Sequence, residues 1–152
     1  MTDHPSDAMR ELVTFTVGAQ RYCVDIMDVR ELRGWSLATR IPHAPNFVHG
    51  VINLRGAVLP IIDLSARFGL GQADPTARHV VMVVSIDRKL VGLLVDAVSD
   101  IIVVPRNELR APPDTVGDEL REFVEAFLTM EDRLIGLVKL AAINASAESL
   151  AA

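Results

Sequence analysis

Short apolar runs, each about the length of a β-strand, recur along this chain. Residues 11–17 alternate between apolar and polar positions, and a second run follows at residues 22–26 after a short turn. Since successive side chains of a strand point to opposite faces, this pattern predicts a hairpin with one buried face. Two valine-rich runs at 80–86 and 90–95 flank Asp87-Arg88-Lys89 and predict a second hairpin.

A third hairpin is predicted around Leu54-Arg55-Gly56, which separates two further apolar runs. Glycine at this place allows the backbone to reverse tightly. We therefore expect Arg55 at or beside the tip of a hairpin whose arms belong to a core. A long, permanently charged side chain on such a rigid mount suits recognition better than catalysis.

The whole pattern gives about eight to ten short strands at regular spacing, which is typical of β-barrels or sandwiches. Residues 69–78 contain two glycines and Pro75 and predict an exposed linker between two small lobes of similar size. No convincing sequence repeat relates these lobes. We expect a disordered tail at residues 1–10, a single domain of two lobes at 11–145, and a frayed tail at 146–152.

Composition supports one soluble domain. The 152 residues are 50% hydrophobic but only 5% aromatic, so the core must consist mainly of Val, Ile, Leu and Ala. The net charge of −5 argues against a nucleic-acid or anionic membrane surface. The single cysteine, Cys23, excludes an intrachain disulfide, and no secretory signal or membrane-length apolar run is present. We expect a cytoplasmic protein.

No set of residues predicts catalysis, a metal site or a cofactor. The four histidines do not cluster with Cys23 or with carboxylates: His4, His43, His49 and His79. Cys23 lies within a predicted strand and is expected to be a small core residue rather than a nucleophile. The serines lack a nucleophile motif, and the glycines form no phosphate-binding loop.

Two aspartates leave alternatives open. Asp96 and Asp100 are expected to flank a turn, where capping of that turn and a binding role are about equally compatible with the sequence. Glu31 stands among alternating charges, and a solvated face is the simplest interpretation.

Several segments together resemble the CheW family of chemotaxis adaptors, in order and over about residues 11–140. The most specific is Asn53-Leu54-Arg55-Gly56 with the returning Pro60-Ile61-Ile62-Asp63-Leu64. The others are Asp25-Ile26, Val29-Arg30-Glu31-Leu32, Gly50-Val51-Ile52, Val91-Gly92-Leu93-Leu94-Val95-Asp96, Val98-Ser99-Asp100 and Arg110-Ala111-Pro112-Pro113.

This resemblance implies two SH3-like five-stranded β-barrels that pack against each other and share a hydrophobic core. It also implies a non-catalytic scaffold without cofactors. Such proteins link the cytoplasmic tip of methyl-accepting chemoreceptors to the regulatory domain of the histidine kinase CheA, which shares this fold. Recruitment to membrane-associated receptor arrays would follow from these contacts, without direct binding to the membrane or to nucleic acid.

The residues that match receptor- or kinase-contacting positions of the family are Arg55, Asn53, Glu31, Val29, Gly50, Val80 and Val81. For the three valines the alternative is a purely structural place in the core. Three positions depart from the family pattern, all in the second half: Ala126, Gly136 and Lys139.

Two other functions stay open from the sequence. One is a CheW-like adaptor of a related pathway, such as surface motility or second-messenger signalling. The other is a small β-barrel that binds a ligand or an oligonucleotide, which the acidic pI of about 5.3 and the few aromatic residues disfavour.

Overall fold

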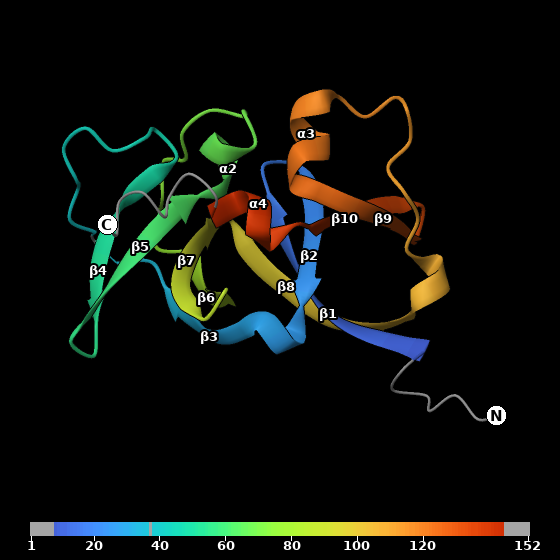
Figure 1. Cartoon of the computed structure of the whole chain (residues 1–152), viewed down its shortest axis with the longest axis horizontal. Coiled ribbons are helices and arrows are strands. Elements are labelled where there is room, and N and C mark those ends of the chain that lie inside the picture. Colours follow the sequence, from blue (N-terminus) through green and yellow to red (C-terminus); the bar gives the residue numbers. More distant parts are fainter. Residues whose placement is uncertain (1–7, 37, 145–152) are drawn as a thin grey trace.

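Ten strands form two five-stranded sheets in the computed structural model, which describes residues 8–36 and 38–144 (Figure 1). Lobe A has the strand order β8-β1-β2-β10-β9, and lobe B has the order β3-β6-β7-β5-β4. The expected all-β fold with two five-stranded lobes is confirmed. The strands of lobe A are β1 Met9–Val17, β2 Gln20–Asp25, β8 Ala97–Pro105, β9 Val124–Met130 and β10 Arg133–Val138. Those of lobe B are β3 Val29–Gly34, β4 Val48–Leu54, β5 Ala57–Asp63, β6 Val80–Ile86 and β7 Lys89–Val95.

The helices are short. They are α2 Leu64–Arg67, α3 Asp118–Phe123, α4 Leu140–Asn144 and the 3-10 turns η1 Ile26–Asp28 and η2 Arg106–Glu108. Strand β1 already begins at Met9, so the ordered domain starts earlier than the expected boundary at residue 11. Residues 1–7 of the expected tail at 1–10, and the whole expected tail at 146–152, lie outside the described residues.

The chain passes from one lobe to the other twice, and this corrects the expected lobe boundary. Strand β2 of lobe A continues through η1 into β3, which pairs with β6 of lobe B. Strand β7 of lobe B continues into β8, which pairs with β1 of lobe A. The expected linker at 69–78 was wrong as a boundary, because it joins β5 to β6 within lobe B. Lobe A is assembled from both ends of the chain.

The strands of the two lobes pair in matching registers, which reveals a structural repeat. The β4–β5 ladder skips one residue between Val48 and Gly50, and the β9–β10 ladder skips one residue between Val124 and Ala126. In both lobes the second strand of that hairpin then pairs in parallel, β5 with β7 and β10 with β2.

A matching backbone hydrogen bond follows each of these hairpins. The Asp63 amide donates to the Phe47 carbonyl, and the Lys139 amide donates to the Phe123 carbonyl, both at 2.7 Å. Strand β3 follows β2 of lobe A but pairs in lobe B, and β8 follows β7 of lobe B but pairs in lobe A; we call β3 and β8 the exchanged strands. Because this exchange is reciprocal, the rotation that carries lobe A onto lobe B also carries lobe B onto lobe A. The lobes are therefore related by a quasi-twofold axis.

The core has three apolar layers. One cluster fills lobe A, a second fills lobe B, and the largest lies between the lobes and draws on both. Strand β6 shows the division, because Val81 and Val83 point into lobe B whereas Met82 and Val84 point into the shared layer. A strand buried on both faces needs no polar alternation, which explains the continuous valine-rich runs of the sequence.

Arg67 fastens the short helices at one end of the shared layer. Its guanidinium carbon lies 4.0 Å from the ring centre of Phe47 and 4.7 Å from that of Phe123, which occupy equivalent places in the two lobes. Its Nη2 donates to the Ala142 carbonyl at 3.1 Å, so α2 is tied to α4. Burial lowers the pKa of Arg67, and the nearby Glu122 carboxylate opposes this.

Gly92 of β7 permits the packing inside lobe B. A Cβ atom at this position would lie 2.6 Å from Cδ1 of Ile61 and 2.8 Å from Cγ1 of Val81. We expect Gly92→Val to lower the free energy of unfolding by about 1–3 kcal/mol, because two buried side chains must move.

Chemical denaturation of the two purified proteins measures this loss. The matched control is Gly34→Val at the end of β3, where an added Cβ meets no atom within 4 Å. Equal stability of Gly92→Val and the wild type would contradict the described packing of lobe B.

Candidate functional site

Arg55 stands at the tip of the β4–β5 hairpin, as expected. Arg55 and Gly56 adopt positive φ angles of 51° and 88°, which reverse the chain between the two strands. The Asn53 side-chain oxygen accepts a hydrogen bond from the Gly56 amide at 2.8 Å and holds this turn. Asn53 therefore stabilises the turn that positions Arg55, whose side chain is 69% exposed.

Glu31 of β3 lies under this tip and binds Arg55 with both carboxylate oxygens. The distances are 3.2 Å from Arg55 Nη2 to Oε1 and 3.5 Å from Nη1 to Oε2. Arg33 Nη1 lies 3.7 Å from the same Oε1. The structure thus brings together Arg55, Asn53 and Glu31, with two cations around one carboxylate.

Gly50 of β4 is buried and has a structural role. Thr39 and Val51 exchange two backbone hydrogen bonds, at 2.8 and 2.9 Å. A Cβ atom on Gly50 would lie 2.5 Å from the Thr39 carbonyl oxygen. Glycine is therefore required for the close approach of the segment around Thr39 to this strand.

An apolar groove runs between the two exchanged strands. Val29 and Leu32 of β3 form one side, Val98 and Ile101 of β8 form the other, and Val13 of β1 lies at the floor. Leu32 is 50% exposed and Ile101 is 54% exposed, which is high for such apolar side chains. The complete lining is Val13, Ile26, Val29, Leu32, Val98, Ser99, Asp100 and Ile101.

The β8 half of this groove was missed by the sequence analysis. Ile101 lies in an uninterrupted run of apolar residues that predicts burial. Nothing in the sequence shows that β8 is the edge strand of lobe A, because that depends on its pairing with β1.

The two valines of β6 lie away from this groove. Val81 is 3% exposed and belongs to the core of lobe B, so its side chain is not accessible to a partner. Val80 is half-buried and packs against the shared layer. Of the three valines expected at a partner surface, only Val29 lines the groove.

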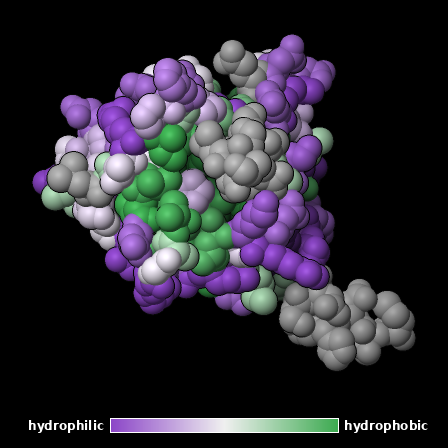
Figure 2. Space-filling model, turned by 60° about the vertical axis from the view of Figure 1, so that its left-hand side comes forward, coloured by the Kyte–Doolittle hydropathy of each residue, from purple (hydrophilic) through white to green (hydrophobic). Residues whose placement is uncertain are grey.

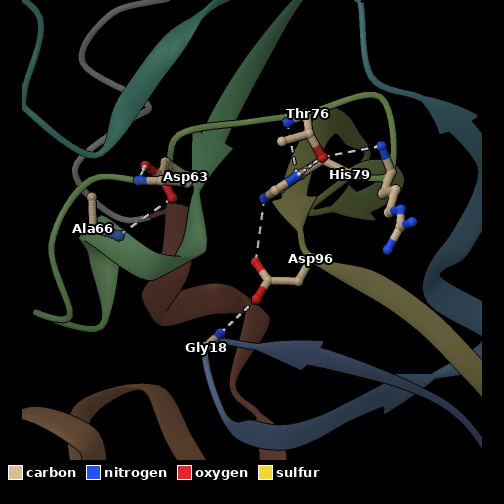
Figure 3. Close-up of polar contacts among 8 residues, drawn as sticks. Gly18, Asp63, Ala66, Thr76, His79 and Asp96 are labelled. Carbon is tan, nitrogen blue, oxygen red and sulfur yellow. Dashed lines mark hydrogen bonds and ion pairs between the residues drawn. The ribbon is translucent and has the colours of Figure 1, made fainter.

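Asp96 joins the lobes rather than flanking a simple turn. One carboxylate oxygen accepts the Gly18 amide of lobe A at 2.8 Å, and the other lies 3.5 Å from His79 Nε2 (Figure 3). His79 Nδ1 accepts the Thr76 amide at 3.0 Å, which secures the segment before β6. Asp100 lies within β8, so the expectation that both aspartates flank a turn was wrong.

The buried Asp63 holds the start of the same segment. Its carboxylate accepts the Ala73 amide at 2.7 Å and the Ala66 amide at 3.4 Å (Figure 3). These contacts satisfy both oxygens, so Asp63 has a structural role.

No catalytic group emerges within residues 8–36 and 38–144. This part of the chain holds no cluster of His, Cys, Asp and Glu that could bind a metal ion. Cys23 is fully buried, and burial raises the pKa of its thiol to about 12, with Arg10 acting in the opposite direction. Such a thiol is not a nucleophile at neutral pH. None of the helices described is long and apolar enough to span a membrane.

A second apolar surface lies on the side that carries β4 and β5. Figure 2 brings this side forward and shows a continuous apolar patch bordered by hydrophilic side chains. Val58 of β5 is 71% exposed, and Leu134, its equivalent in β10, is 44% exposed. The β4–β5 hairpin of lobe B and the β9–β10 hairpin of lobe A, called the outer hairpins below, therefore each present an exposed apolar side chain.

Known proteins resemble this chain over nearly its whole length. The family model described as CheW-like domain matches residues 11–148. The probable chemotaxis protein CheW of Rhizobium etli is 53% identical over 143 residues, which cover 94% of this chain and 92% of the relative. The chemotaxis protein CheW of Rhizobium meliloti is 52% identical over 149 residues, covering 98% and 96%.

A solved structure shares the fold. The crystal structure of the scaffolding protein TtCheW from Thermoanaerobacter tengcongensis superposes with a TM-score of 0.77 at 35% identity. The match covers 86% of this chain and 88% of that one. The resemblance seen in the sequence is thereby confirmed.

The buried thiol of Cys23 makes stability depend on pH. The folded protein keeps this proton up to a pKa of about 12, whereas the unfolded chain loses it near 9.0. Between these values the folded state binds more protons, so the free energy of unfolding falls as the pH rises. The slope from this group is at most about 1.4 kcal/mol per pH unit.

Urea unfolding from pH 8 to pH 10.5 tests this slope, with Cys23→Ala as the comparison. We expect the wild type to lose stability more steeply than the variant, whatever their difference at pH 8. Parallel slopes would contradict the burial of an un-ionised thiol.

Proposed function

The chain belongs to the family of CheW-like domain proteins, and on that premise we propose how this chemotaxis adaptor holds its two partners. It is a non-catalytic scaffold. One partner is the cytoplasmic tip of methyl-accepting chemoreceptors, and the other is the regulatory domain of a CheA-type histidine kinase. The observation that carries the assignment is the exposed apolar groove between β3 and β8, with the Arg55–Glu31 pair on the adjacent hairpin.

We assign the receptor tip to this groove. The tip is a helical hairpin, and an apolar groove accepts the apolar stripe of an amphipathic helix. Leu32 and Ile101 are exposed on opposite sides of the groove, where they can contact such a stripe. Arg55, with its guanidinium largely in solvent, can pair with a carboxylate or a carbonyl of the receptor.

We assign the kinase to the outer hairpins. The kinase regulatory domain shares this fold, and the exposed Val58 and Leu134 occupy equivalent positions at the two ends of the molecule. Placing the kinase there leaves the groove free, so both partners can be held at once. Binding to many receptors would then recruit the protein to arrays, where weak contacts gain avidity. The net charge of −5 gives no attraction to anionic lipids.

Arg55→Glu should weaken receptor binding without unfolding the protein. The exposed pair with Glu31 contributes less than about 1 kcal/mol to folding, because solvent screens it. Loss of a charge-assisted contact, replaced by repulsion, should lower receptor affinity about tenfold or more. Co-sedimentation with receptor-containing membranes measures this, and circular dichroism reports the fold.

The matched control is Arg88→Glu. Arg88 also occupies a positive-φ position in a hairpin turn, with φ of 68°, but it lies between β6 and β7. Equal binding of Arg55→Glu and Arg88→Glu would remove Arg55 from the receptor surface.

Substitutions on the two surfaces should separate the two partners. We expect Val58→Arg and Leu134→Arg to weaken capture of the kinase by about tenfold, because a buried contact is replaced by a charge, and to leave receptor binding intact. Leu32→Asp should do the reverse. Leu70→Asp is the control, because Leu70 is 56% exposed and belongs neither to the groove lining nor to the β4–β5 or β9–β10 hairpin. Loss of both partners from each variant would contradict separate sites.

A further inference from the structure

The sides of the groove are equivalent under the quasi-twofold axis. Strand β3 pairs Val29 with Val84 and Glu31 with Val83, so Arg30 is the extra residue of a bulge. Strand β8 has the same irregularity.

In β8, Val98 pairs with Phe15 and Asp100 pairs with Thr14, so Ser99 is the extra residue. The two bulges align β3 and β8 residue by residue. Val29 corresponds to Val98, Glu31 to Asp100, and Leu32 to Ile101.

This symmetry has a consequence for any helix in the groove. A half-turn about the axis exchanges Val29 with Val98 and Leu32 with Ile101, so the two apolar sides of the groove are nearly unchanged. A helix has a direction, whereas this pair of sides has none. Apolar contacts alone would therefore hold a helix almost equally well in either orientation.

Charged residues break the symmetry. Glu31 is shared by Arg55 at 3.2 Å and Arg33 at 3.7 Å, which leaves a surplus of positive charge around this carboxylate. Its counterpart Asp100 is exposed, and one of its oxygens accepts only the neighbouring Ile101 amide at 2.8 Å. Across residues 8–36 and 38–144, Asp100 takes part in no ion pair. The two symmetry-related places thus carry opposite charge.

We infer that Arg55 and Asp100 fix the direction in which a receptor helix lies in the groove. An acidic side chain of the helix faces Arg55, and a basic one faces Asp100. The reversed helix would place like charges together at both of these contacts, which disfavours it. This inference rests on the proposed receptor site and makes Asp100 a specificity-determining residue of it.

Disulfide cross-linking can measure the direction. Arg30 and Ser99 are exposed and equivalent, one on each side of the groove, and each can be replaced by cysteine in the full chain. The native Cys23 is fully buried and does not compete. The partner is the cytoplasmic fragment of a chemoreceptor from the same bacterium, with single cysteines placed one at a time along its tip helices.

With the natural charges, Arg30→Cys and Ser99→Cys should react with different cysteines of one receptor helix, in one order along that helix. Adding Asp100→Asn should lower the preference for that order about tenfold, because one of the two orienting contacts is lost. Asp87→Asn, at an exposed turn between β6 and β7, should preserve the order.

An order that survives Asp100→Asn unchanged, or no preferred order in the wild type, would overturn the inference while leaving the receptor site in place. Absence of receptor binding by the wild type would instead overturn the proposed function.

Discussion

The reciprocal exchange of β3 and β8 across the shared apolar layer is the constraint on which the molecule depends. Each of these strands completes the sheet of one lobe while the chain connects it directly to the other. Lobe A therefore combines strands from both ends of the chain, with all five strands of lobe B between them, which couples the two lobes. The shared layer, which includes the fully buried Phe15 and Met82, reinforces this coupling because strands of both lobes bury one face in it. The relative position of the lobes is fixed by pairing and packing together.

A scaffold requires binding surfaces at fixed relative positions and no catalytic group. The groove lies between the two exchanged strands, so its sides are held by hydrogen-bond ladders rather than by loops. Arg55 gains the same rigidity from the β4–β5 hairpin and from the Asn53 side chain that braces its turn. Rigid surfaces lose little entropy on binding, which helps small interfaces to be specific. The β4–β5 and β9–β10 hairpins, where we propose that the kinase binds, are held by strand pairing in the same way.

Local patterns in the sequence were sufficient for the hairpins, because alternation and turn residues are local properties. They do not show which strands pair across the chain, so they predict a lobe boundary at 69–78, where the structure instead joins β5 to β6 within lobe B. The repeat was hidden because equivalent positions carry different side chains. Arg55 corresponds to Glu131 and Pro60 to Gly136, although the registers agree. Val81 matched a partner-contacting position of the family, with a place in the core as the alternative, and its side chain is only 3% exposed. A continuous apolar run does not by itself tell a core residue from a surface one.

Hydrogen exchange of the full chain, alone and with each partner, can show whether the exchanged strands form the receptor site and the outer hairpins form the kinase site. We predict that a receptor fragment slows exchange in β3 and β8, and that the kinase regulatory domain slows it in β4–β5 and β9–β10. Receptor protection confined to the outer hairpins, with β3 and β8 unchanged, would contradict the account.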